Sequence, residues 1–595
     1  MSFQVPIMKL LWICLPGRYI VNLNRTQYGT SITTIFGSKE SPCTLLIHTL
    51  FIIPYLTRIL VCVTVCSALS TPSSLFSMKN KMSATTPSST TSLSTDDIYA
   101  LVDAHGHHIP PVSTGIFLTT ILAAVPVWLC VLPVSILYQT GFAVLRAIVG
   151  NKPHPDLTPI DSGIQVNVNE IIDRSKRKYD VILLGATGFT GGLAVEHLVK
   201  TYGVNQNVNW AIAGRSIDKL EQLKRKIAKE LGNDDILQVD VLKVDTTDPS
   251  TLPTLVSNTR VVISTAGPFE KYGSPVVEFC AKYGTHYVDI TGESDWVRTM
   301  ILHWDKTAQL TGAKIVSMCG NDSIPWDLSV MKLEKELQDG ETLTQVTCLN
   351  EFVGAPSGGT MDTIITNLEG GSRGAPQHAF EIFLMLPDRS SSDAILNIQL
   401  PGFVSKIKHT GRYSESYIGP MLLSAVNAAW VSRSTALRGM AKDCIYVEGA
   451  VFPNLKTALV NWFTTLLFFT MLLNPVTAYP IKKYFLPKPG KGPSRDDMLN
   501  KFYLVVTANA IGSKGTQVQS VMYFPRDSGY IDTARMVTES GLALALSEGE
   551  ITSPGGFFTA STAVGMGQIL LDRLQTTGTY FATKIVSSDQ KSTAL

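Results

Sequence analysis

The chain has 595 residues, and its 50 lysines and arginines nearly balance its 48 aspartates and glutamates, giving a net charge of +2. That length predicts about three or four folded units rather than a single domain. The balanced charge argues against a nucleic-acid partner. Only 16% of the residues are charged, against roughly 25% in soluble domains, and this deficit indicates contact with a membrane.

The nine cysteines are scattered along the chain. They form no CxxC pair and no Cys/His cluster with the spacing of a metal site, so we expect no bound metal. Without a disulfide framework, the simplest interpretation is reduced thiols in a body that faces the cytosol.

Residues 1–115 predict a poorly defined N-terminal extension. An apolar run at 43–69 fits a signal anchor, a transit element or translated sequence outside the functional protein. The Ser-, Thr- and Pro-rich stretch at 70–94 is typical of a disordered linker.

A longer uncharged run spans residues 116–145 and exceeds the roughly 20 residues that cross a bilayer. Pro126 and Pro133 inside it predict a kink or a hairpin turn. Aspartates precede the run and basic residues follow it, so the positive-inside tendency places the later chain in the cytosol. We expect a transmembrane or hairpin segment, with a buried core helix as the alternative.

A short apolar strand at 179–184 leads directly into a glycine-rich loop, after which a helical pattern begins. In a dinucleotide-binding fold such a loop turns tightly, lets the backbone approach the pyrophosphate and packs the helix on the strand. The phosphates then bind free N–H groups at the positive end of the helix. The spacing is G-x-x-G-x-x-G, and a plain glycine-rich turn is the alternative. The residues assigned to the cofactor loop are Gly185, Ala186, Thr187, Gly188, Phe189, Thr190 and Gly191.

The second strand, at 209–213, is followed by Arg215 and Ser216. NAD-preferring sites usually carry an acidic residue here for the ribose hydroxyls. An arginine instead pairs with the adenosine 2′-phosphate through charge-assisted hydrogen bonds, so these residues favour NADP, with NAD as a second possibility. A solvated arginine at the start of a helix over 217–231 is the simpler alternative.

Two further loops complete the predicted nucleotide-binding domain at 178–325. A strand at 237–244 ends beside Asp245, which we place near the adenine amino group. The next strand ends at Ala266 and Gly267, where backbone commonly passes the middle of the cofactor. The alternation of strands and helices predicts a doubly wound parallel sheet with ligands at the carboxyl ends of its strands.

A third apolar run, at 458–479, has lysines on both sides. That pattern gives no preferred orientation for a spanning helix and favours a hairpin or an interfacial segment entering from one face. Strands at 502–508 and 518–524, then helices at 533–546 and 560–574, continue the chain after it.

We therefore expect a second domain at 326–530 that includes the apolar run. Residues 531–595 are expected to form C-terminal helices that pack back on the body. The predicted fold class is α/β: a Rossmann-type doubly wound parallel sheet plus a second α+β domain, with apolar membrane-associated segments.

Several motifs occur in a fixed order and carry a family resemblance. They are GATGFTG at 185–191, STAGPFEKYG at 264–273, YVDITGE at 287–293, GNDSIPWD at 320–327 and SGGT at 357–360. Together they resemble the saccharopine dehydrogenase-like oxidoreductases, including the bacterial trans-acting enoyl reductases of glycolipid assembly. The resemblance covers about residues 178–584. It implies a Rossmann domain, a second α/β domain and a nicotinamide cofactor, and its eukaryotic members are associated with lipid droplets and membranes.

Polar residues near the expected nicotinamide are the catalytic candidates. Tyr287, Asp289 and Glu293 belong to the segment of the fifth strand, His286 to Glu293, and two carboxylates close to a cofactor can shuttle a proton. Hydride transfer itself belongs to the cofactor.

Two other sets of residues have simpler interpretations. Asp322, Ser323 and Asp327 are further candidates, but the two aspartates also fit a simpler role, in which they cap the helix from Trp326 onward and fix a turn. Tyr479 and Lys483 match a Tyr-x-x-x-Lys pair, which needs a helix to align it. Because Pro480 lies between them, we assign this pair no catalytic role.

The leading hypothesis is an NADP-dependent oxidoreductase on a membrane or lipid droplet that reduces a lipid or glycolipid precursor, such as an enoyl group. Its body is expected in the cytosol, at the endoplasmic reticulum or on lipid droplets, and a homodimer is left open. The alternatives are a non-catalytic dinucleotide-binding scaffold on the same surfaces and a saccharopine reductase of lysine metabolism.

Overall fold

The computed structural model describes the following residues: 24–26, 29–31, 93–149, 163, 171–369, 396–407, 412–413, 415–439, 441–488 and 490–587. It divides into two units, residues 1–77 and 78–595. In the first unit, β1 (Asn24–Thr26) pairs with β2 (Gly29–Ser31). The apolar run predicted at 43–69 and nearly all of the predicted linker lie outside the described residues.

One sheet of the second unit is parallel throughout and confirms the predicted Rossmann architecture. Its strand order is β16-β8-β7-β6-β3-β4-β5, which is the 3-2-1-4-5-6 order of dinucleotide-binding folds with one parallel strand added at the edge. The strands are β3 (Tyr179–Leu184), β4 (Trp210–Gly214), β5 (Asp240–Lys243), β6 (Thr259–Ser264), β7 (His286–Asp289), β8 (Lys314–Val316) and β16 (Gly556–Phe558).

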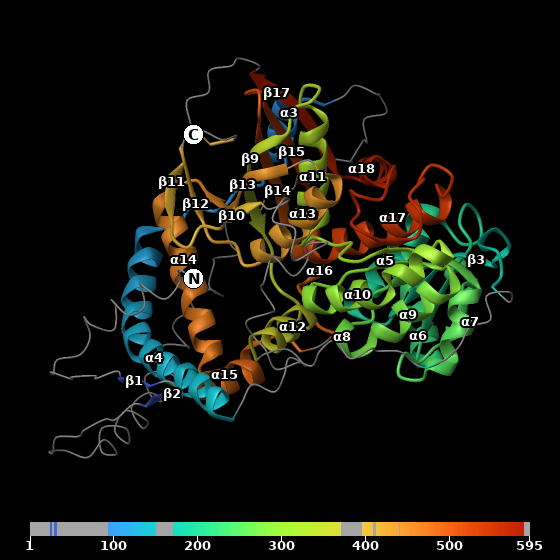
Figure 1. Ribbon diagram of the computed structural model, residues 1–595, viewed down its shortest axis with the longest axis horizontal. Coiled ribbons are helices and arrows are strands. Elements are labelled where there is room, and N and C mark those ends of the chain that lie inside the picture. The colour runs from blue at the N-terminus through green and yellow to red at the C-terminus, as the bar shows by residue number, and fades with distance from the viewer. Residues whose placement is uncertain are drawn as a thin grey trace. The chain divides into compact units, whose positions relative to one another are not determined.

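Helices cover both faces of this sheet (Figure 1). The predicted helix over 217–231 is confirmed as α6, with Ser216 as its N-cap and Gly232 in the left-handed conformation after it. The strand predicted at 237–244 is shorter, because residues 234–238 form a 3-10 turn ahead of β5. The helices are α5 (Phe189–Tyr202), α6 (Ile217–Leu231), α7 (Leu252–Ser257), α8 (Phe269–Tyr272), α9 (Ser274–Tyr283) and α10 (Ser294–Thr311).

The C-terminal part of the chain completes the dinucleotide-binding half. Helix α17 (Thr533–Leu546) packs on α5 and on three strands of the sheet. Gly541 allows this approach, since a Cβ there would lie 2.6 Å from the Ile263 side chain. Residues nearly 300 positions apart in sequence therefore share one core, because the second sheet is inserted between them.

The second sheet is mixed and runs in the order β11-β12-β13-β9-β14-β15-β17, with β10 also paired to β13. The strands predicted at 502–508 and 518–524 are confirmed as β14 and β15. The strands are β9 (Leu343–Val353), β10 (Asn397–Gln399), β11 (Ser405–Ile407), β12 (Ser416–Gly419), β13 (Ala441–Phe452), β14 (Tyr503–Gly512), β15 (Gln517–Phe524) and β17 (Tyr580–Ser587).

The second sheet also has its own helices. The helix predicted from residue 560 begins later, as α18, because the Thr562 hydroxyl accepts the Thr559 N–H in a turn at 559–563. The helices are α11 (Ile324–Lys335), α12 (Gly358–Glu369), α13 (Ser424–Arg438), α16 (Arg495–Asn500) and α18 (Met566–Thr576).

Residues ahead of the first apolar run belong to the folded body. Helix α3 (Thr95–Ala104) buries Ile98 and Val102 against aromatic and aliphatic side chains of β14 and β15. His107, just beyond it, contacts the Tyr523 hydroxyl through Nδ1 at 2.7 Å. This part of the predicted extension is thus anchored to the second sheet.

The apolar runs form long helices. Helix α4 (Thr114–Val149) continues through Pro126 and Pro133, so the hairpin turn predicted there is wrong, although the helix bends along its length (Figure 1). Helix α14 (Leu455–Leu473) is followed by α15 (Pro475–Pro480) and a π-helical turn at 481–485. Residues 114–138 of α4 and all of α14 are long and apolar enough to cross a membrane.

Helices α4 and α14 lie side by side (Figure 1) and run in the same direction. Near their first turns, Lys456 Nζ donates to Thr114 Oγ1 at 3.0 Å. Farther along, the Trp128 and Trp462 rings meet edge to face at 6.4 Å. Near the end of α14, Ser135 Oγ donates to the Thr470 carbonyl at 3.4 Å. The pair is therefore not an antiparallel hairpin.

Candidate cofactor and active site

The glycine-rich loop connects β3 to α5 at the carboxyl edge of the parallel sheet. Gly185 has a φ of +89°, and a Cβ there would lie 2.8 Å from the Ala266 nitrogen of the neighbouring loop. At Gly191 a Cβ would lie 2.3 Å from the Gly185 carbonyl oxygen and 2.8 Å from Thr265 Oγ1. Both positions need glycine because the two loops and the helix pack directly against one another.

The first turn of α5 leaves its backbone N–H groups free of side-chain caps. Gly188 is the N-cap residue and supplies no side-chain hydrogen bond. Thr187 and Gly188 are exposed, whereas Phe189 and Thr190 are half-buried. An uncapped, accessible helix start fits a pyrophosphate, which binds such N–H groups and the positive end of the helix dipole.

Arg215 follows β4, Asp245 follows the neighbouring strand β5, and Tyr272 is the last residue of α8. The Arg215 guanidinium lies over the Tyr272 ring at 5.7 Å and is exposed to solvent. The pKa of Asp245 is lowered, first by hydrogen bonds from the Thr247 N–H and hydroxyl and then by the Arg215 charge. A cation held over an aromatic ring beside the loop after β4 fits the 2′-phosphate end of NADP. Ser216 Oγ instead accepts the Lys219 N–H at 3.4 Å and caps α6.

The loop after β6 contains Ala266 and Gly267, and Glu293 holds it in place. The carboxylate of Glu293 accepts the Phe269 N–H at 3.0 Å and the Glu270 N–H at 2.7 Å. Burial raises the pKa of Glu293 to about 7, although these two hydrogen bonds lower it. In this structure Glu293 therefore fixes the loop that passes the cofactor, and its predicted catalytic role stays a prediction.

Asp289 is fully buried at the end of β7 and binds the turn after β8. Its carboxylate accepts the Met318 N–H at 2.9 Å, the Thr291 N–H at 3.1 Å and the Ser317 hydroxyl at 3.0 Å. Burial raises the pKa of Asp289 to about 6.

Tyr287 lies in the core below Asp289. Burial and then the neighbouring Asp289 charge raise the pKa of its hydroxyl. A catalytic role for either residue stays a prediction, but both side chains lie in the interior.

Asp322 and Asp327 lie at the start of α11 but do not cap it. Helix α11 begins at Ile324 and has no side-chain cap, so the helix-capping interpretation is wrong for both aspartates. Asp327 is fully buried and accepts the Ser561 N–H at 3.1 Å and the Ser561 hydroxyl at 2.6 Å. Asp322 is half-buried, and Asn321 Nδ2 donates to it at 3.1 Å.

Sequence reasoning missed Tyr530, which joins the glycine loop to the second domain. Its ring meets the Phe189 ring edge to face at 5.3 Å. Its hydroxyl accepts the Ser357 N–H and lies 2.8 Å from Thr360 Oγ1, at the start of α12. The SGGT motif at 357–360 was the available signal for this contact, but nothing in the sequence links it to residue 530.

The segment that follows the apolar helices passes through the same place. A Cβ on Gly358 would lie 2.1 Å from the Lys488 carbonyl oxygen, and one on Gly492 would lie 2.4 Å from the Phe189 ring. Lys488 is therefore packed against the start of α12, and Gly492 is packed against the cofactor loop. This close packing accounts for Gly358 in the motif.

Tyr479 and Lys483 are aligned in spite of Pro480. The chain stays helical through α15 and the following π-helical turn. Lys483 Nζ donates to the Tyr479 hydroxyl at 3.2 Å, in an exposed position. The prediction that Pro480 prevents this alignment is thus wrong. Within the described residues, no group of three or more His, Cys, Asp and Glu side chains could hold a metal.

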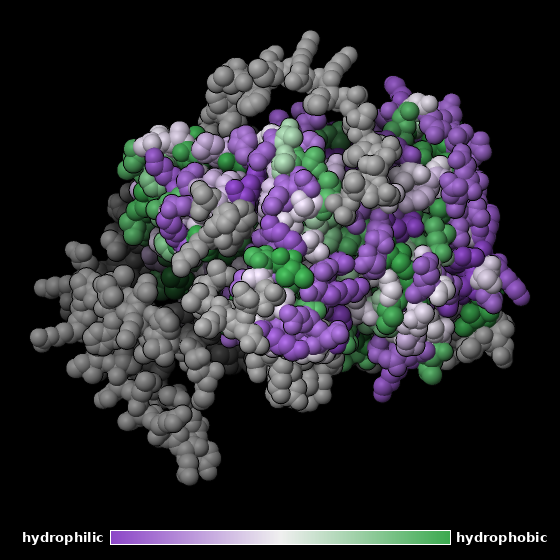
Figure 2. Space-filling view, turned by 90° about the horizontal axis from the view of Figure 1, so that it is seen from above, coloured by the Kyte–Doolittle hydropathy of each residue, from purple (hydrophilic) through white to green (hydrophobic). Residues whose placement is uncertain are grey.

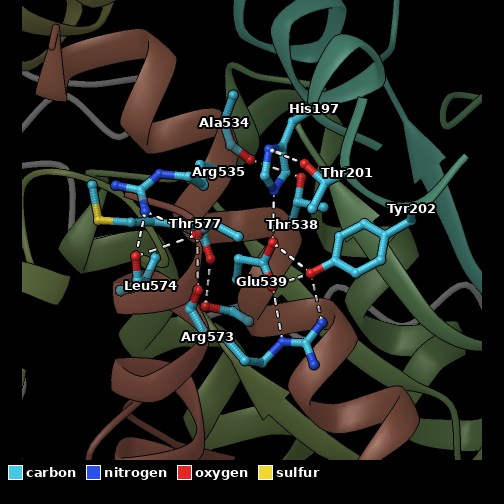
Figure 3. Close-up of polar contacts among 12 residues, drawn as sticks. His197, Thr201, Tyr202, Ala534, Arg535, Thr538, Glu539, Arg573, Leu574 and Thr577 are labelled. Atoms are coloured by element: carbon cyan, nitrogen blue, oxygen red, sulfur yellow. Dashed lines mark hydrogen bonds and ion pairs between the residues drawn. The ribbon is translucent and has the colours of Figure 1, made fainter. Parts of the chain in front are cut away.

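A buried polar cluster clamps α5 to the C-terminal helices (Figure 3). The Glu539 carboxylate of α17 contacts His197 Nε2 at 2.6 Å and accepts the Tyr202 hydroxyl at 2.8 Å, both from α5. Arg573 Nε of α18 donates to it at 2.9 Å. Because α5 carries the cofactor loop at its start, this clamp fixes the helix on which the loop depends.

Comparison with known proteins agrees with this geometry. The sequence profile of the saccharopine dehydrogenase NADP binding domain matches residues 181–316. A candidate trans-acting enoyl reductase of Mycobacterium tuberculosis is 30% identical over 427 residues, covering 69% of this chain and 99% of that protein. A trans-acting enoyl reductase of Mycobacterium ulcerans is 30% identical over 437 residues, covering 68% and 97%.

A solved structure, an apo saccharopine dehydrogenase (L-Glu forming) from Saccharomyces cerevisiae, is 16% identical. It covers 68% of this chain and 99% of its own, with a TM-score of 0.38, too low to carry an argument. The sequence matches confirm the predicted resemblance, and the NADP-binding profile confirms NADP as the predicted cofactor.

Proposed function

This chain belongs to the trans-acting enoyl reductase family of NADP-dependent oxidoreductases, and from that premise we propose that it reduces an enoyl double bond in a lipid-like substrate at a membrane or lipid-droplet surface. The observation that carries the proposal is the course of the chain after α15. From the apolar helices it runs directly to the start of α12 and to the cofactor loop. A lipid surface at those helices would thus be joined to the cofactor loop by a short stretch of chain.

The test is direct turnover. We expect the purified full chain in detergent micelles to oxidise NADPH when given a long-chain trans-2-enoyl thioester, with the saturated thioester as product by mass spectrometry. The saturated thioester is the matched control and should give no oxidation. NADPH binding without turnover of any enoyl lipid would contradict the proposal. A lipid comparison between cells with and without the protein would then identify the substrate class.

Arg215 provides a prediction about cofactor choice. We expect Arg215→Ala to raise the Kd for NADPH about 10- to 100-fold, because charge-assisted hydrogen bonds to a phosphate contribute about 1.5–3 kcal/mol. The Kd for NADH should change little, since NADH has no 2′-phosphate. Fluorescence titration of both cofactors measures the two constants. An equal loss of affinity for NADH and NADPH would mean that Arg215 does not bind the 2′-phosphate.

Support for a lipid surface comes from how the apolar helices leave and rejoin the body. The strand before α14 is β13 and the next strand after it is β14, and both pair with the same strand, β9. An excursion that begins and ends on one sheet does not carry the chain across a bilayer. We therefore infer that α14 and α15 enter the lipid from one face, with the body in the cytosol.

Helix α4 presents an apolar face to the same lipid. Leu118, Leu122, Leu129 and Leu137 are 52–72% exposed and fall on one side of the helix. Elsewhere the surface differs: Figure 2 shows hydrophilic residues along its right-hand edge, where Figure 1 places α6 and α7. Exposed leucines gathered along one helix face mark a membrane interaction site.

This face gives a prediction about location. We expect the triple variant Leu122→Glu, Leu129→Glu and Leu137→Glu to lose vesicle binding by about 1000-fold, since each buried leucine contributes about 1.5 kcal/mol or more. Flotation with phosphatidylcholine vesicles measures the bound fraction, and the Kd for NADPH should be unchanged. The control is Leu310→Glu on α10, where the leucine is 89% exposed away from the apolar helices. Equal flotation of the triple variant and the wild type would contradict membrane docking through α4.

A further inference from the structure

The turn after β8 is held in an unusual conformation by Asp289. Met318 has a φ of +58°, which residues with side chains rarely adopt. The Asp289 carboxylate accepts the Met318 N–H at 2.9 Å, and the Asp289 carbonyl accepts the Cys319 N–H at 2.7 Å. Ser323 Oγ closes the turn by donating to the Met318 carbonyl. A strained turn fixed by this many contacts is typical of a segment that positions a functional group.

The group that this turn positions is Asp322. The turn follows β8 at the carboxyl edge of the parallel sheet, the edge at which such folds bind their ligands. The Asn321 N–H is fixed by Thr533 Oγ1 at 3.0 Å, while Asn321 Nδ2 donates to Asp322 at 3.1 Å. Among the described residues, no cation pairs with the Asp322 carboxyl.

A neighbouring atom indicates that a ligand or water belongs here. Asn321 is 5% exposed, and its side-chain carbonyl oxygen has no hydrogen-bond partner among the described residues. A buried acceptor without a donor is costly unless another molecule supplies one. The groups around Asp322 therefore have the polar character of a binding site.

The groups near Asp322 come from both domains. The negative charge of Asp322 helps to raise the pKa of the Tyr530 hydroxyl. The Tyr530 ring packs on Phe189, next to Gly188 of the cofactor loop. Its hydroxyl is fixed by Ser357 and Thr360 of the second domain. Tyr530 thus connects the surroundings of Asp322 to the cofactor loop and to the start of α12.

We propose that Asp322 is the catalytic acid that protonates the α carbon of the enoyl substrate, and that Asp289 is a positioning residue for it. The proposal rests on the proposed function. When bound, NADPH supplies the hydride and its two electrons to the β carbon and becomes NADP⁺. The electron pair of the former double bond then takes the proton of the Asp322 carboxyl, so that a C–H bond forms and an O–H bond breaks. Water then returns a proton to the carboxylate.

The protonation state of Asp322 suits this role. Burial raises the pKa of its carboxyl to about 6, although the Asn321 hydrogen bond lowers it. Tyr530 is the titratable group that the described elements bring against it, and burial raises the pKa of that hydroxyl as well. A carboxyl of this kind is protonated below about pH 6 and loses its proton above, so turnover should fall as the pH rises through that value.

The test compares Asp322→Asn with the wild type, using the full chain in micelles, NADPH and a long-chain trans-2-enoyl thioester. We expect kcat to fall about 100- to 10,000-fold, the contribution of a general acid, with the Kd for NADPH and the melting temperature unchanged. The fall of wild-type kcat above about pH 6 should be absent from the residual activity of the variant.

The control is Asp327→Asn, which changes the aspartate bound to Ser561. It should lower the melting temperature and keep the wild-type pH profile. A kcat for Asp322→Asn within threefold of wild type, or an unchanged pH profile, overturns the role of Asp322 and leaves the reductase activity standing. Absence of turnover in the wild type overturns the proposed function instead.

Discussion

Gly191→Ala is expected to abolish NADPH binding, raising its Kd by at least about 100-fold, whereas Gly192→Ala one position later leaves the Kd unchanged. A Cβ at Gly191 would lie 2.3 Å from the Gly185 carbonyl oxygen and 2.9 Å from the Ala186 Cα. These are backbone atoms of the cofactor loop, so the loop itself must move. Overpacking of this kind costs about 1–3 kcal/mol, and the displaced N–H groups no longer meet the pyrophosphate.

Gly192 is the matched control because it lies in the same turn of α5. A Cβ there meets nothing closer than the Leu223 side chain at 3.7 Å. Replacing a helical glycine with alanine should stabilise the protein by about 0.5–1 kcal/mol. Fluorescence titration with NADPH gives the two constants, and thermal unfolding shows whether each variant is folded. Normal NADPH binding by folded Gly191→Ala would mean that the cofactor does not use this loop.

The position of the cofactor loop could be predicted because its signal is local. The strand at 179–184, the glycines that follow and the start of α5 are adjacent in sequence, and each has a pattern set by nearest-neighbour sterics. The same holds for Ser216, whose place before an amphipathic helix marks the N-cap of α6.

The neighbours of each catalytic candidate could not be predicted, because they come from distant parts of the chain. Nothing near Glu293 indicates that its carboxylate binds the Phe269 and Glu270 N–H groups, and Asp289 and the turn at 317–319 are separated by a whole helix. Strand β16 pairs with β8 across more than 200 residues. Sequence patterns show which residues are polar. Tertiary contacts decide which of these polar side chains already have hydrogen-bond partners.

For the apolar helices, the sequence-based prediction differs from the structure for another reason. Pro126 and Pro133 predict a kink or a hairpin turn because proline lacks an N–H and clashes with the preceding turn. Helix α4 continues through both prolines and bends, as apolar helices do where neighbouring groups satisfy the freed carbonyls. Its parallel arrangement with α14 depends on contacts such as Ser135 with Thr470, which join segments more than 300 residues apart.

Of the substitutions considered for this protein, removal of the Glu539 carboxylate should cause the largest loss of folding stability. Glu539 is fully buried, and its two oxygens are shared among His197, Tyr202 and Arg573 from α5 and α18 (Figure 3). Glu539→Ala leaves these groups without their acceptor, and breaking such a buried network costs about 3–5 kcal/mol. We expect the thermal midpoint of the dinucleotide-binding half to fall by roughly 5–15 °C. The thermal midpoint of Glu539→Gln should lie between those of the wild type and Glu539→Ala, because an amide keeps one acceptor and loses the charge.

The pH dependence of this clamp has a definite sign. Burial raises the pKa of Glu539, but the hydrogen bond and charge of His197, the charge of Arg573 and the Tyr202 hydroxyl together hold it below its ordinary value of 4.5. A carboxyl whose pKa is lower in the folded state stabilises the fold above its unfolded pKa and loses that contribution as the pH falls through the folded value. The difference in thermal midpoint between wild type and Glu539→Ala should therefore be constant near neutral pH and shrink below about pH 4.5.

The control for the clamp is Glu230→Ala on α6. Glu230 is 41% exposed and pairs with Lys226 at 3.7 Å, and exposed pairs of this kind contribute less than about 1 kcal/mol. Its thermal midpoint should match the wild type within about 2 °C. Intrinsic tryptophan fluorescence follows the relevant transition, since Trp210 is buried in the dinucleotide-binding half. If Glu539→Ala has the same thermal midpoint as the Glu230→Ala control, then α5 is held by apolar packing on α17 alone. The polar cluster would then contribute nothing to the stability of the helix that carries the cofactor loop.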